Sequence, residues 1–490
     1  MVVVLRHQVG HPTSRAEIYF EQEVEMCVIP VSPPIKILHG TCNHKNKEIS
    51  SFVSTLLLYN TNNMIKLSPK KIGKDFVCSI LESQVRRLRK KHNFKLVAVV
   101  GSIGKTSTKL AIAHALEPSR RVMYQTGNYN DRVTVPLVMF GRKLPSLFNV
   151  PAWVKIFLLN EKTIRLPYFY DVVVVELGTD KPGEIARFAY LEPDITVVTA
   201  ITPEHMECFK TLDGVAKEEL TVCDFSKKIL VNADDTPAQY LEGRGVLTYG
   251  QNPSNTYKVT NYESQGLQGA DVELQLASEP PFQAKAHILG RQGMKILLAA
   301  AAVGQLIGLT DDELQRGLQE IRPFAGRMQI LTGIKGSTII DDTYNASPAP
   351  VMAALDVLYA ADAPQRIAIL GNMNELGEYS EEAHVTVGSY CRPDMLDFVV
   401  TIGPDAEKYL APAARAKGCT VHSFSSPYEA GDFIAKQLKE KAIVLAEGSQ
   451  NLVFAEESLK PLLADKADEH KLVRQSQYWL NIKSKQFTTL

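Results

Sequence analysis

The stretch Val-Val-Gly-Ser-Ile-Gly-Lys-Thr-Ser-Thr, residues 99–108, decides how this chain folds. It joins an apolar run at 96–100, which predicts a buried strand, to a helical pattern that begins near Lys105. A strand, a glycine turn and a helix N-terminus together form a cradle for phosphate, because free backbone N–H groups and the positive end of the helix dipole face the anion. Lys105 would reach the β- and γ-phosphates, and the Thr106 hydroxyl would ligate Mg²⁺. The sequence therefore predicts a phosphate-binding loop built from Gly101, Ser102, Gly104, Lys105, Thr106 and Ser107.

This loop is shorter than the usual Gly-x-x-x-x-Gly-Lys-Ser/Thr, because Val99 stands where the first glycine belongs. A tight turn with a solvent-facing lysine is the alternative interpretation. It does not explain why two glycines, a lysine and several hydroxyl groups coincide between a strand and a helix.

Length and composition describe a large globular protein with room for several cores. The 490 residues are 45% hydrophobic and 22% charged, and the net charge is zero. A neutral chain gives no electrostatic reason to expect nucleic acid or a membrane as partner. Residues 1–95 hold 15 Lys and Arg against 7 Asp and Glu, with much of the excess at 86–91. We interpret that basic run as a solvated helix face rather than a nucleic-acid site.

The seven cysteines are irregularly spaced and form neither a disulfide framework nor a zinc pattern. The first residues lack the features of a signal peptide, and no apolar run approaches the ~18 residues of a membrane span. We therefore expect a cytoplasmic protein without membrane insertion.

The pattern of strands and helices predicts an α/β protein of three domains. Residues 96–322 would form a central domain, a mostly parallel sheet with the phosphate loop and helices on both faces. Residues 323–465 would form a C-terminal Rossmann-like α/β domain. Residues 1–95 are an N-terminal segment with a plausible helix at 75–92, and 466–490 a polar, peripheral tail. Strands are expected at 96–100, 121–124, 171–176, 195–200, 228–232, 257–262, 271–276, 338–341, 366–370, 398–402, 420–424 and 442–446, and a long helix at 294–307.

Two residues beyond strand ends are candidate metal ligands. Glu176 closes a run of four valines, and a carboxylate at the carboxyl end of a parallel strand beside a phosphate loop suits Mg²⁺. His205 follows the strand expected at 195–200. A surface carboxylate and a structural histidine are the alternatives.

Polar groups elsewhere are candidates for substrate and nucleotide binding. Asn128 and Asn130 lie on a glycine loop and would hold substrate, unless they are only turn residues. Arg327 stands at the inferred hinge between domains and would reach a phosphate across a cleft, unless it is a solvated arginine. The turn after the strand at 338–341 offers carboxylate, phenol and amide groups suited to a nucleoside, in Asp342, Tyr344 and Asn345. Because both the central and the C-terminal domain offer groups that suit a nucleotide, we expect the two domains to close around it.

The joint pattern resembles the Mur ligase superfamily, the ATP-dependent amide-forming ligases of peptidoglycan precursor synthesis. The motifs appear in order from about residue 96 to 465: the phosphate loop, Gly127-Asn-Tyr-Asn, Glu176-Leu-Gly, His205-Met-Glu-Cys-Phe, Val231-Asn-Ala-Asp-Asp, Gly326-Arg, Asp341-Asp-Thr-Tyr-Asn-Ala-Ser-Pro, Gly371-Asn-Met-Asn-Glu-Leu-Gly and Glu447-Gly-Ser.

The resemblance implies that ATP phosphorylates a substrate carboxylate and that an amine then attacks the acyl phosphate. It implies ATP and Mg²⁺, with UDP-muramoyl tripeptide and D-alanyl-D-alanine as the preferred small-molecule substrates of a monomer. One metal site would use Thr106 and Glu176, and a second His205 and Glu176. Arg327 and Asn345 would contact ATP by the same likeness.

Three departures from the family pattern affect the substrate and metal sites. Many members carry a carbamylated lysine two positions after the lysine aligned with Lys217, and here that position is Glu219. Glu219 serves as the metal-binding anion, or Lys217 is modified in a shifted register, or the second metal binds weakly. The family's Gly-x-His-Asn-x-x-Asn reads Gly290-Arg-Gln-Gly-Met-Lys-Ile, and its Lys-Gly-Ser reads Glu447-Gly-Ser. Residues 1–95 do not show the usual UDP-sugar domain.

Other functions remain open from the sequence alone. The same chemistry would suit a folylpolyglutamate- or cyanophycin-type ligase or a muropeptide-modifying enzyme, although no four-cysteine zinc ribbon occurs. The departures also allow a nucleotide-binding protein that has lost catalysis. A GTPase switch is disfavoured because the chain contains no Asn-Lys-x-Asp motif.

Overall fold

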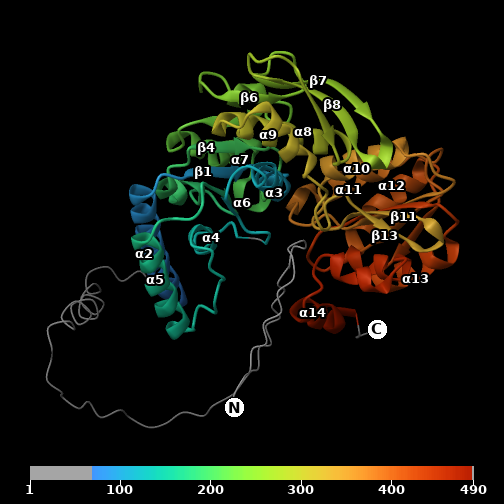
Figure 1. The fold of residues 1–490 in the computed structure, drawn as a ribbon. Coiled ribbons are helices and arrows are strands. Elements are labelled where there is room, and N and C mark those ends of the chain that lie inside the picture. The colour runs from blue at the N-terminus through green and yellow to red at the C-terminus, as the bar shows by residue number, and fades with distance from the viewer. Residues whose placement is uncertain (1–68, 128, 488–490) are drawn as a thin grey trace, which may run out of the picture. The chain divides into compact units, whose positions relative to one another are not determined.

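The computed structural model describes residues 69–127 and 129–487, which belong to a compact unit that begins at Ser68. This part of the chain contains two β-sheets with helices packed on them (Figure 1). The predicted α/β fold class is confirmed. The predictions for residues 1–68 concern a part of the chain outside the described residues.

The first sheet has nine strands in the order β2-β3-β1-β4-β5-β6-β7-β8-β9. Neighbours from β2 to β7 are parallel, and β7, β8 and β9 are antiparallel. The bounds are β1 Lys95–Val100, β2 Val122–Met123, β3 Val172–Glu176, β4 Ile195–Val198, β5 Ile229–Asn232, β6 Leu247–Gly250, β7 Tyr257–Ser264, β8 Ala270–Leu276 and β9 Phe282–Ala286. Because β1, β3 and β4 are parallel neighbours, their carboxyl ends meet at one edge.

Helices cover both faces of this sheet, which explains the unbroken apolar runs of β1 and β3. On one face lie α3 (Lys105–Leu116), α8 (Gly290–Ile307) and α9 (Asp311–Gln319). On the other lie α2 (Pro69–Lys91), α4 (Thr134–Met139), the 3₁₀ helix η2 (Ile185–Leu191) and α7 (Leu212–Glu219). The helix expected at 75–92 is α2. It packs on this domain although it precedes residue 96, and α5 (Val150–Arg165) lies beside it (Figure 1).

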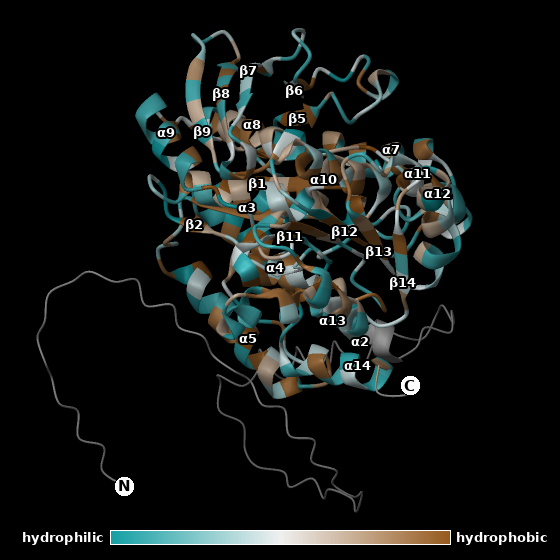
Figure 2. Ribbon diagram, turned by 90° about the vertical axis from the view of Figure 1, so that its right-hand side faces the viewer, coloured by the Kyte–Doolittle hydropathy of each residue, from teal (hydrophilic) through white to brown (hydrophobic). Residues whose placement is uncertain are grey.

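The second sheet has the order β10-β11-β15-β12-β13-β14, in which only β10 is antiparallel to its neighbour. The bounds are β10 Gln329–Thr332, β11 Thr338–Asp342, β12 Arg366–Gly371, β13 Phe398–Ile402, β14 Val421–Phe424 and β15 Ile443–Glu447. Around the sheet are α10 (Pro348–Ala360), α11 (Ser380–Tyr390), α12 (Ala411–Ala416) and α13 (Pro427–Gln437). Figure 2 shows β12 and β13 as hydrophobic strands within this layer.

The C-terminal segment differs from the peripheral tail that its polar composition predicts. It contains α14 (Gln477–Phe487), and Lys483 on that helix is fully buried. The Lys483 ammonium lies 2.8 Å from Glu456 Oε1 and 2.6 Å from Glu457 Oε1, both on the 3₁₀ helix η9 (Ala455–Leu462). Sequence reasoning did not indicate this contact, because a lysine is read as a surface residue until its buried partners are known.

No helix within the described ranges is long and apolar enough to cross a membrane.

Candidate active site

The loop between β1 and α3 is fixed by close backbone packing against the end of β4. Gly101 has φ +120°, and a Cβ there would stand 2.5 Å from Thr199 Oγ1. The Ser102 N–H donates to the Ala200 carbonyl at 2.9 Å, and Gly104 with φ +78° precedes the first residue of α3. These contacts explain why glycine is required at position 101.

The ammonium of Lys105 lies inside this loop. It donates to the carbonyls of Gly101 at 2.6 Å and Ser102 at 3.2 Å, and it lies 3.1 Å from Glu204 Oε1. Burial alone would lower the pKa of Lys105, but the carboxylates of Glu204, Glu219 and Glu176 outweigh it and raise that pKa. The loop therefore holds a stable positive charge where phosphate is expected.

Glu176 at the end of β3 faces the first turn of α3. The Thr106 hydroxyl donates to Glu176 Oε2 at 2.9 Å, the Lys109 ammonium lies 3.2 Å from the same oxygen, and the Asn130 amide donates to Oε1 at 3.3 Å. Burial would raise the pKa of Glu176, but Lys109 and Lys105 lower it, so the carboxylate is charged.

The pair Thr106 and Glu176 fits a magnesium ion. Adjacent ligands of an octahedral Mg²⁺, each at about 2.1 Å, lie about 3 Å apart. The Thr106 and Glu176 oxygens have this separation at 2.9 Å. A hydroxyl and a charged carboxylate are also oxygen ligands of the type Mg²⁺ prefers.

Glu219, and not Lys217, lies at the phosphate loop. Glu219 is 1% exposed, and its Oε2 accepts the Gly101 N–H at 2.8 Å. Burial raises the pKa of Glu219 to about 7, against the opposing pull of Lys105. Lys217 is exposed on the other side of α7, so the structure does not bring it to the site. Glu218, between them, binds the backbone N–H groups of Gly183 and Ile185.

His205 lies close to acidic groups other than Glu176. Its ring nitrogens are 3.5 Å from Glu204, 3.6 Å from Asp180 and 3.6 Å from Glu375, and the last belongs to the C-terminal domain. Across residues 69–127 and 129–487, no group of three or more His, Cys, Asp or Glu side chains is arranged to hold a metal ion. The second metal site expected from His205 and Glu176 stays a prediction.

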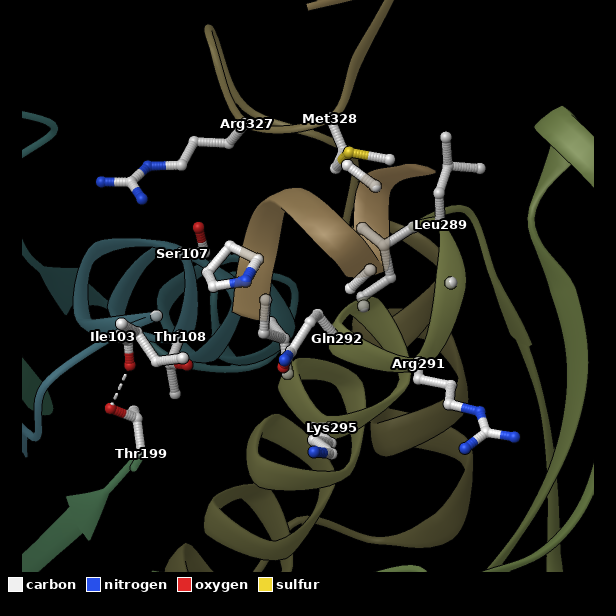
Figure 3. Close-up of a pocket in the computed structure, with 18 of the residues that line it drawn as sticks. Ile103, Ser107, Thr108, Thr199, Leu289, Arg291, Gln292, Lys295, Arg327 and Met328 are labelled. Atoms are coloured by element: carbon white, nitrogen blue, oxygen red, sulfur yellow. Dashed lines mark hydrogen bonds between the residues drawn. The ribbon is translucent and has the colours of Figure 1, made fainter. Parts of the chain in front are cut away.

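A pocket lies beside the phosphate loop, between α3, the start of α8 and the C-terminal domain (Figure 3). Ser107 and Thr108 of α3 line it, with Leu289, Gln292 and Lys295 at α8. Its apolar walls include Ile103, Ile288, Leu289, Ile296, Pro350, Ala353, Ala354 and Val357. An apolar slot with a few polar groups next to a phosphate loop suits the base and ribose of a nucleotide.

The C-terminal domain brings Arg327 and Asp342 to this pocket. The Arg327 guanidinium lies over the Tyr344 ring, 4.1 Å from its centroid, and its buried Nε has no hydrogen-bond partner in the part of the chain described. Asn345 is exposed and is not among the lining residues, and Asn128 lies outside the described residues.

Asp342 is paired with a second acid. Asp342 and Glu447 are direct partners on the parallel strands β11 and β15, and Glu447 is 1% exposed. Burial raises the pKa of Glu447 strongly, and the nearby Asp342 raises it further. Both effects favour the protonated form of Glu447. Glu447 stands at the position of the lysine in the Lys-Gly-Ser motif described above.

Sequence reasoning missed several groups at the site. Glu204 stands next to His205 but belongs to no motif, and Lys109 reads as an ordinary surface position of a helix. Lys295 forms an ion pair with Asp235 at 2.7 Å and lines the pocket with it. Asp235 closes the motif that begins at Val231, which was the one signal available. The altered positions Gly293 and Ile296 do line the pocket.

Comparison with known proteins places these features in one class. The Mur ligase middle domain matches residues 156–304, and the Mur ligase glutamate ligase domain matches residues 326–450. Together they take in more than half of the chain, which belongs to the Mur ligase superfamily.

Within that superfamily, similar curated relatives are named UDP-N-acetylmuramoyl-tripeptide–D-alanyl-D-alanine ligase. The one from Bacillus subtilis is 27% identical, over 63% of this chain and 63% of the relative. The one from Haemophilus influenzae is 26% identical, over 83% and 85%. The match to the Bacillus relative thus spans less than two thirds of its length.

Solved structures agree on the fold. A MurF ligase from Thermotoga maritima in complex with ADP has a TM-score of 0.64 at 22% identity, over 86% of this chain and 91% of that one. A MurF from Acinetobacter baumannii has a TM-score of 0.63 at 22% identity, over 79% and 80%.

Proposed function

We propose that this chain is an ATP-dependent carboxylate–amine ligase that joins D-alanyl-D-alanine to UDP-N-acetylmuramoyl-tripeptide. The observation that carries the ligase chemistry is the phosphate loop at the carboxyl edge of the sheet, where Lys105 binds a loop carbonyl and Thr106 binds Glu176. The names of the similar relatives support the choice of substrates. ATP would occupy the pocket beside the loop, with its phosphates toward Lys105.

The reaction has two steps. A carboxylate oxygen of the muramoyl tripeptide attacks the γ-phosphorus of ATP, and ADP leaves with the electron pair of the broken P–O bond. The amine of D-alanyl-D-alanine then attacks the acyl phosphate, and inorganic phosphate leaves from the tetrahedral intermediate. The amine loses a proton, and an amide bond remains.

The residues of the site have distinct roles in this scheme. Lys105 and the loop N–H groups stabilise the negative charge that develops on the transferred phosphoryl group. Thr106 and Glu176 would hold Mg²⁺, which supplies further neutralisation of the phosphate charge when bound. Arg327 would reach the nucleotide from the C-terminal domain, and Asn130 orients Glu176 through its amide. Glu219 fixes the backbone of Gly101.

We also propose a cytoplasmic location and a monomer. The reaction consumes ATP and activated sugar nucleotide, and the cysteines among the described residues are free rather than paired.

The test is phosphate release from ATP and Mg²⁺ by the purified chain. Release that requires both UDP-N-acetylmuramoyl-tripeptide and D-alanyl-D-alanine supports the activity and the substrates together. ATP binding without release for this pair would contradict the substrate assignment, and folate, cyanophycin and muropeptide acceptors would then be assayed. If no acceptor supports phosphate release, the remaining interpretation is a nucleotide-binding protein that has lost catalysis.

A further inference from the structure

The segment from 141 to 170 exposes an unusual amount of apolar surface. Half of the large hydrophobic side chains exposed in the described residues lie there. Phe148 is 73% exposed, Leu158 66% and Val150 64%. We call this surface the α5 face, and it consists of Leu144, Leu147, Phe148, Val150, Val154, Leu158, Leu166 and Phe169. Large apolar side chains exposed together in one segment point to an interaction site in a folded protein.

The α5 face is not needed to hold the helix in place. The opposite side of α5 buries Trp153 and Ile156 in a small core with Val77, Cys78 and Leu81 of α2. The outward residues Val150, Val154 and Leu158 are spaced four apart, so they form a stripe along the other side of the helix. The helix therefore has one apolar side for its own fold and a second for something else.

The exposed charged side chains of the segment from 141 to 170 are basic. Lys143, Lys155, Lys162 and Arg165 are exposed in this segment. Its single acidic residue is Glu161, whose carboxylate is paired with Arg87 at 2.7 Å. The exposed surface thus combines an apolar stripe with uncompensated cations, which is the pattern of a helix that lies on an anionic lipid surface.

Two other occupants fit the charges less well. A symmetric dimer would bring the same basic surface of two copies together, since the two patches of such an interface are identical. Residues 1–67 hold 6 Lys and Arg against 5 Asp and Glu, so taken as a whole they offer no excess of negative charge, although Glu17, Glu21, Glu23 and Glu25 lie close together in the sequence.

We propose that the α5 face docks the protein on a membrane surface that contains anionic lipids. The helix lies in the plane of the interface, with Val154, Leu158 and Phe148 among the acyl chains. The lysines extend their ammonium groups to the lipid phosphates. The docking is peripheral and reversible, and it is separate from the ligase chemistry, because no residue of the α5 face lines the pocket.

Vesicle flotation of the full chain tests this proposal. We expect binding to vesicles of phosphatidylcholine mixed with phosphatidylglycerol, and little binding to phosphatidylcholine alone. The double variant Val154→Glu/Leu158→Glu should lose at least about tenfold in bound fraction. Leu452→Glu is the matched control, because Leu452 is 73% exposed but lies in the C-terminal domain. Absence of binding to the anionic vesicles, or equal loss in the control, would overturn the proposal.

A charge test separates lipid from other occupants. Lys155→Glu/Lys162→Glu should weaken binding to anionic vesicles, and Lys417→Glu/Lys436→Glu, with the same change in net charge at exposed positions elsewhere, should not. Thermal unfolding of each variant checks the fold. A wild-type dimer in sedimentation that the α5 variants abolish, together with failure to bind vesicles, would instead assign the face to a second copy.

Discussion

Lys105 and Glu204 form an ion pair inside the phosphate loop, with 3.1 Å between the ammonium and Oε1. The lysine is thus held by an acid as well as by two carbonyls of its own loop. Glu204 is therefore a positioning residue, because it holds the Lys105 ammonium where the phosphate is expected.

We predict that Glu204→Gln shifts the alkaline limit of turnover to lower pH. Glu204 is the largest of the carboxylate effects that raise the pKa of Lys105 against its burial, so its removal lowers that pKa. The ammonium then loses its proton at a lower pH. The pH profile of kcat/KM for ATP checks this, with the exposed neighbour Glu207→Gln as control. An unchanged profile would remove Glu204 from this role.

Lys105→Ala should reduce ATP turnover about a hundredfold or more without unfolding the chain. The reason is that the loop loses the one ammonium that stands among its carbonyls. Turnover and the thermal midpoint are measured together, and the exposed Lys228→Ala serves as control. Full ATP turnover in Lys105→Ala would contradict the assignment of this loop as the phosphate-binding loop.

Gly101→Ala should destabilise the chain by at least about 2 kcal/mol and remove ATP binding. A Cβ at this position meets Thr199 Oγ1 at 2.5 Å and the Ala200 nitrogen at 2.8 Å. Gly183 also has positive φ, but a Cβ there meets nothing within 4 Å, so Gly183→Ala carries only the backbone strain of about 1 kcal/mol. Urea unfolding of the two variants compares them directly. Equal losses would show that packing at Gly101 is unimportant.

The stability of the chain should contain a pH-dependent part from Asp341. Burial raises the pKa of Asp341 to about 6. The folded protein keeps a proton that the unfolded chain has already lost above pH about 4, so this stability falls as the pH rises through about 6. Between pH 5 and 8 the loss is about 1 kcal/mol, and Asp341→Asn should remove it. The free energy of unfolding in urea is measured at both pH values for the wild type and for Asp341→Asn. The same pH dependence in the two proteins would contradict this role of Asp341.

The C-terminal segment should matter for nucleotide binding. Arg474, which precedes α14, donates to the carbonyls of Thr343 and Tyr344 while it binds Glu456. It therefore ties the C-terminal segment to Tyr344, whose ring lies under the Arg327 guanidinium. Lys483→Met leaves two buried carboxylates short of a partner and should cost about 3 kcal/mol. Arg474→Lys, which lacks the forked guanidinium, should mainly raise the KM for ATP. Unchanged KM with reduced stability would make the segment purely structural.

Much of the fold follows from local pattern because buried parallel strands are apolar throughout. Val172–Val175 can only be a strand covered on both faces, and the loop at Gly101 follows from residue types alone. The strands β6, β9 and β10 were not predicted, because their sequences Leu-Thr-Tyr-Gly, Phe-Gln-Ala-Lys-Ala and Gln-Ile-Leu-Thr give only a weak apolar pattern. The helix α8 begins four residues before the expected Met294, because its N-cap Leu289 gives no capping signal.

The candidate site was predictable where a single motif carries the chemistry. Thr106 and Glu176 are separated by 70 residues, yet each stands at a strand or helix end that parallel topology brings to one edge. The sequence alone could not decide whether Lys217 or Glu219 lies at the phosphate loop. Neighbours on a helix point in different directions, and only tertiary packing selects which of them faces the site. The buried partners of Lys483 are likewise invisible without the fold.

The pocket has walls from both domains, with Ser107 on one and Pro350 on the other. Occupancy of the pocket is therefore coupled to any change in the apposition of the two domains. A ligand that contacts both walls favours the apposed arrangement, and its measured affinity is the intrinsic one reduced by the fraction of molecules already apposed. A substitution far from the pocket that alters this fraction would then change nucleotide affinity without touching the nucleotide.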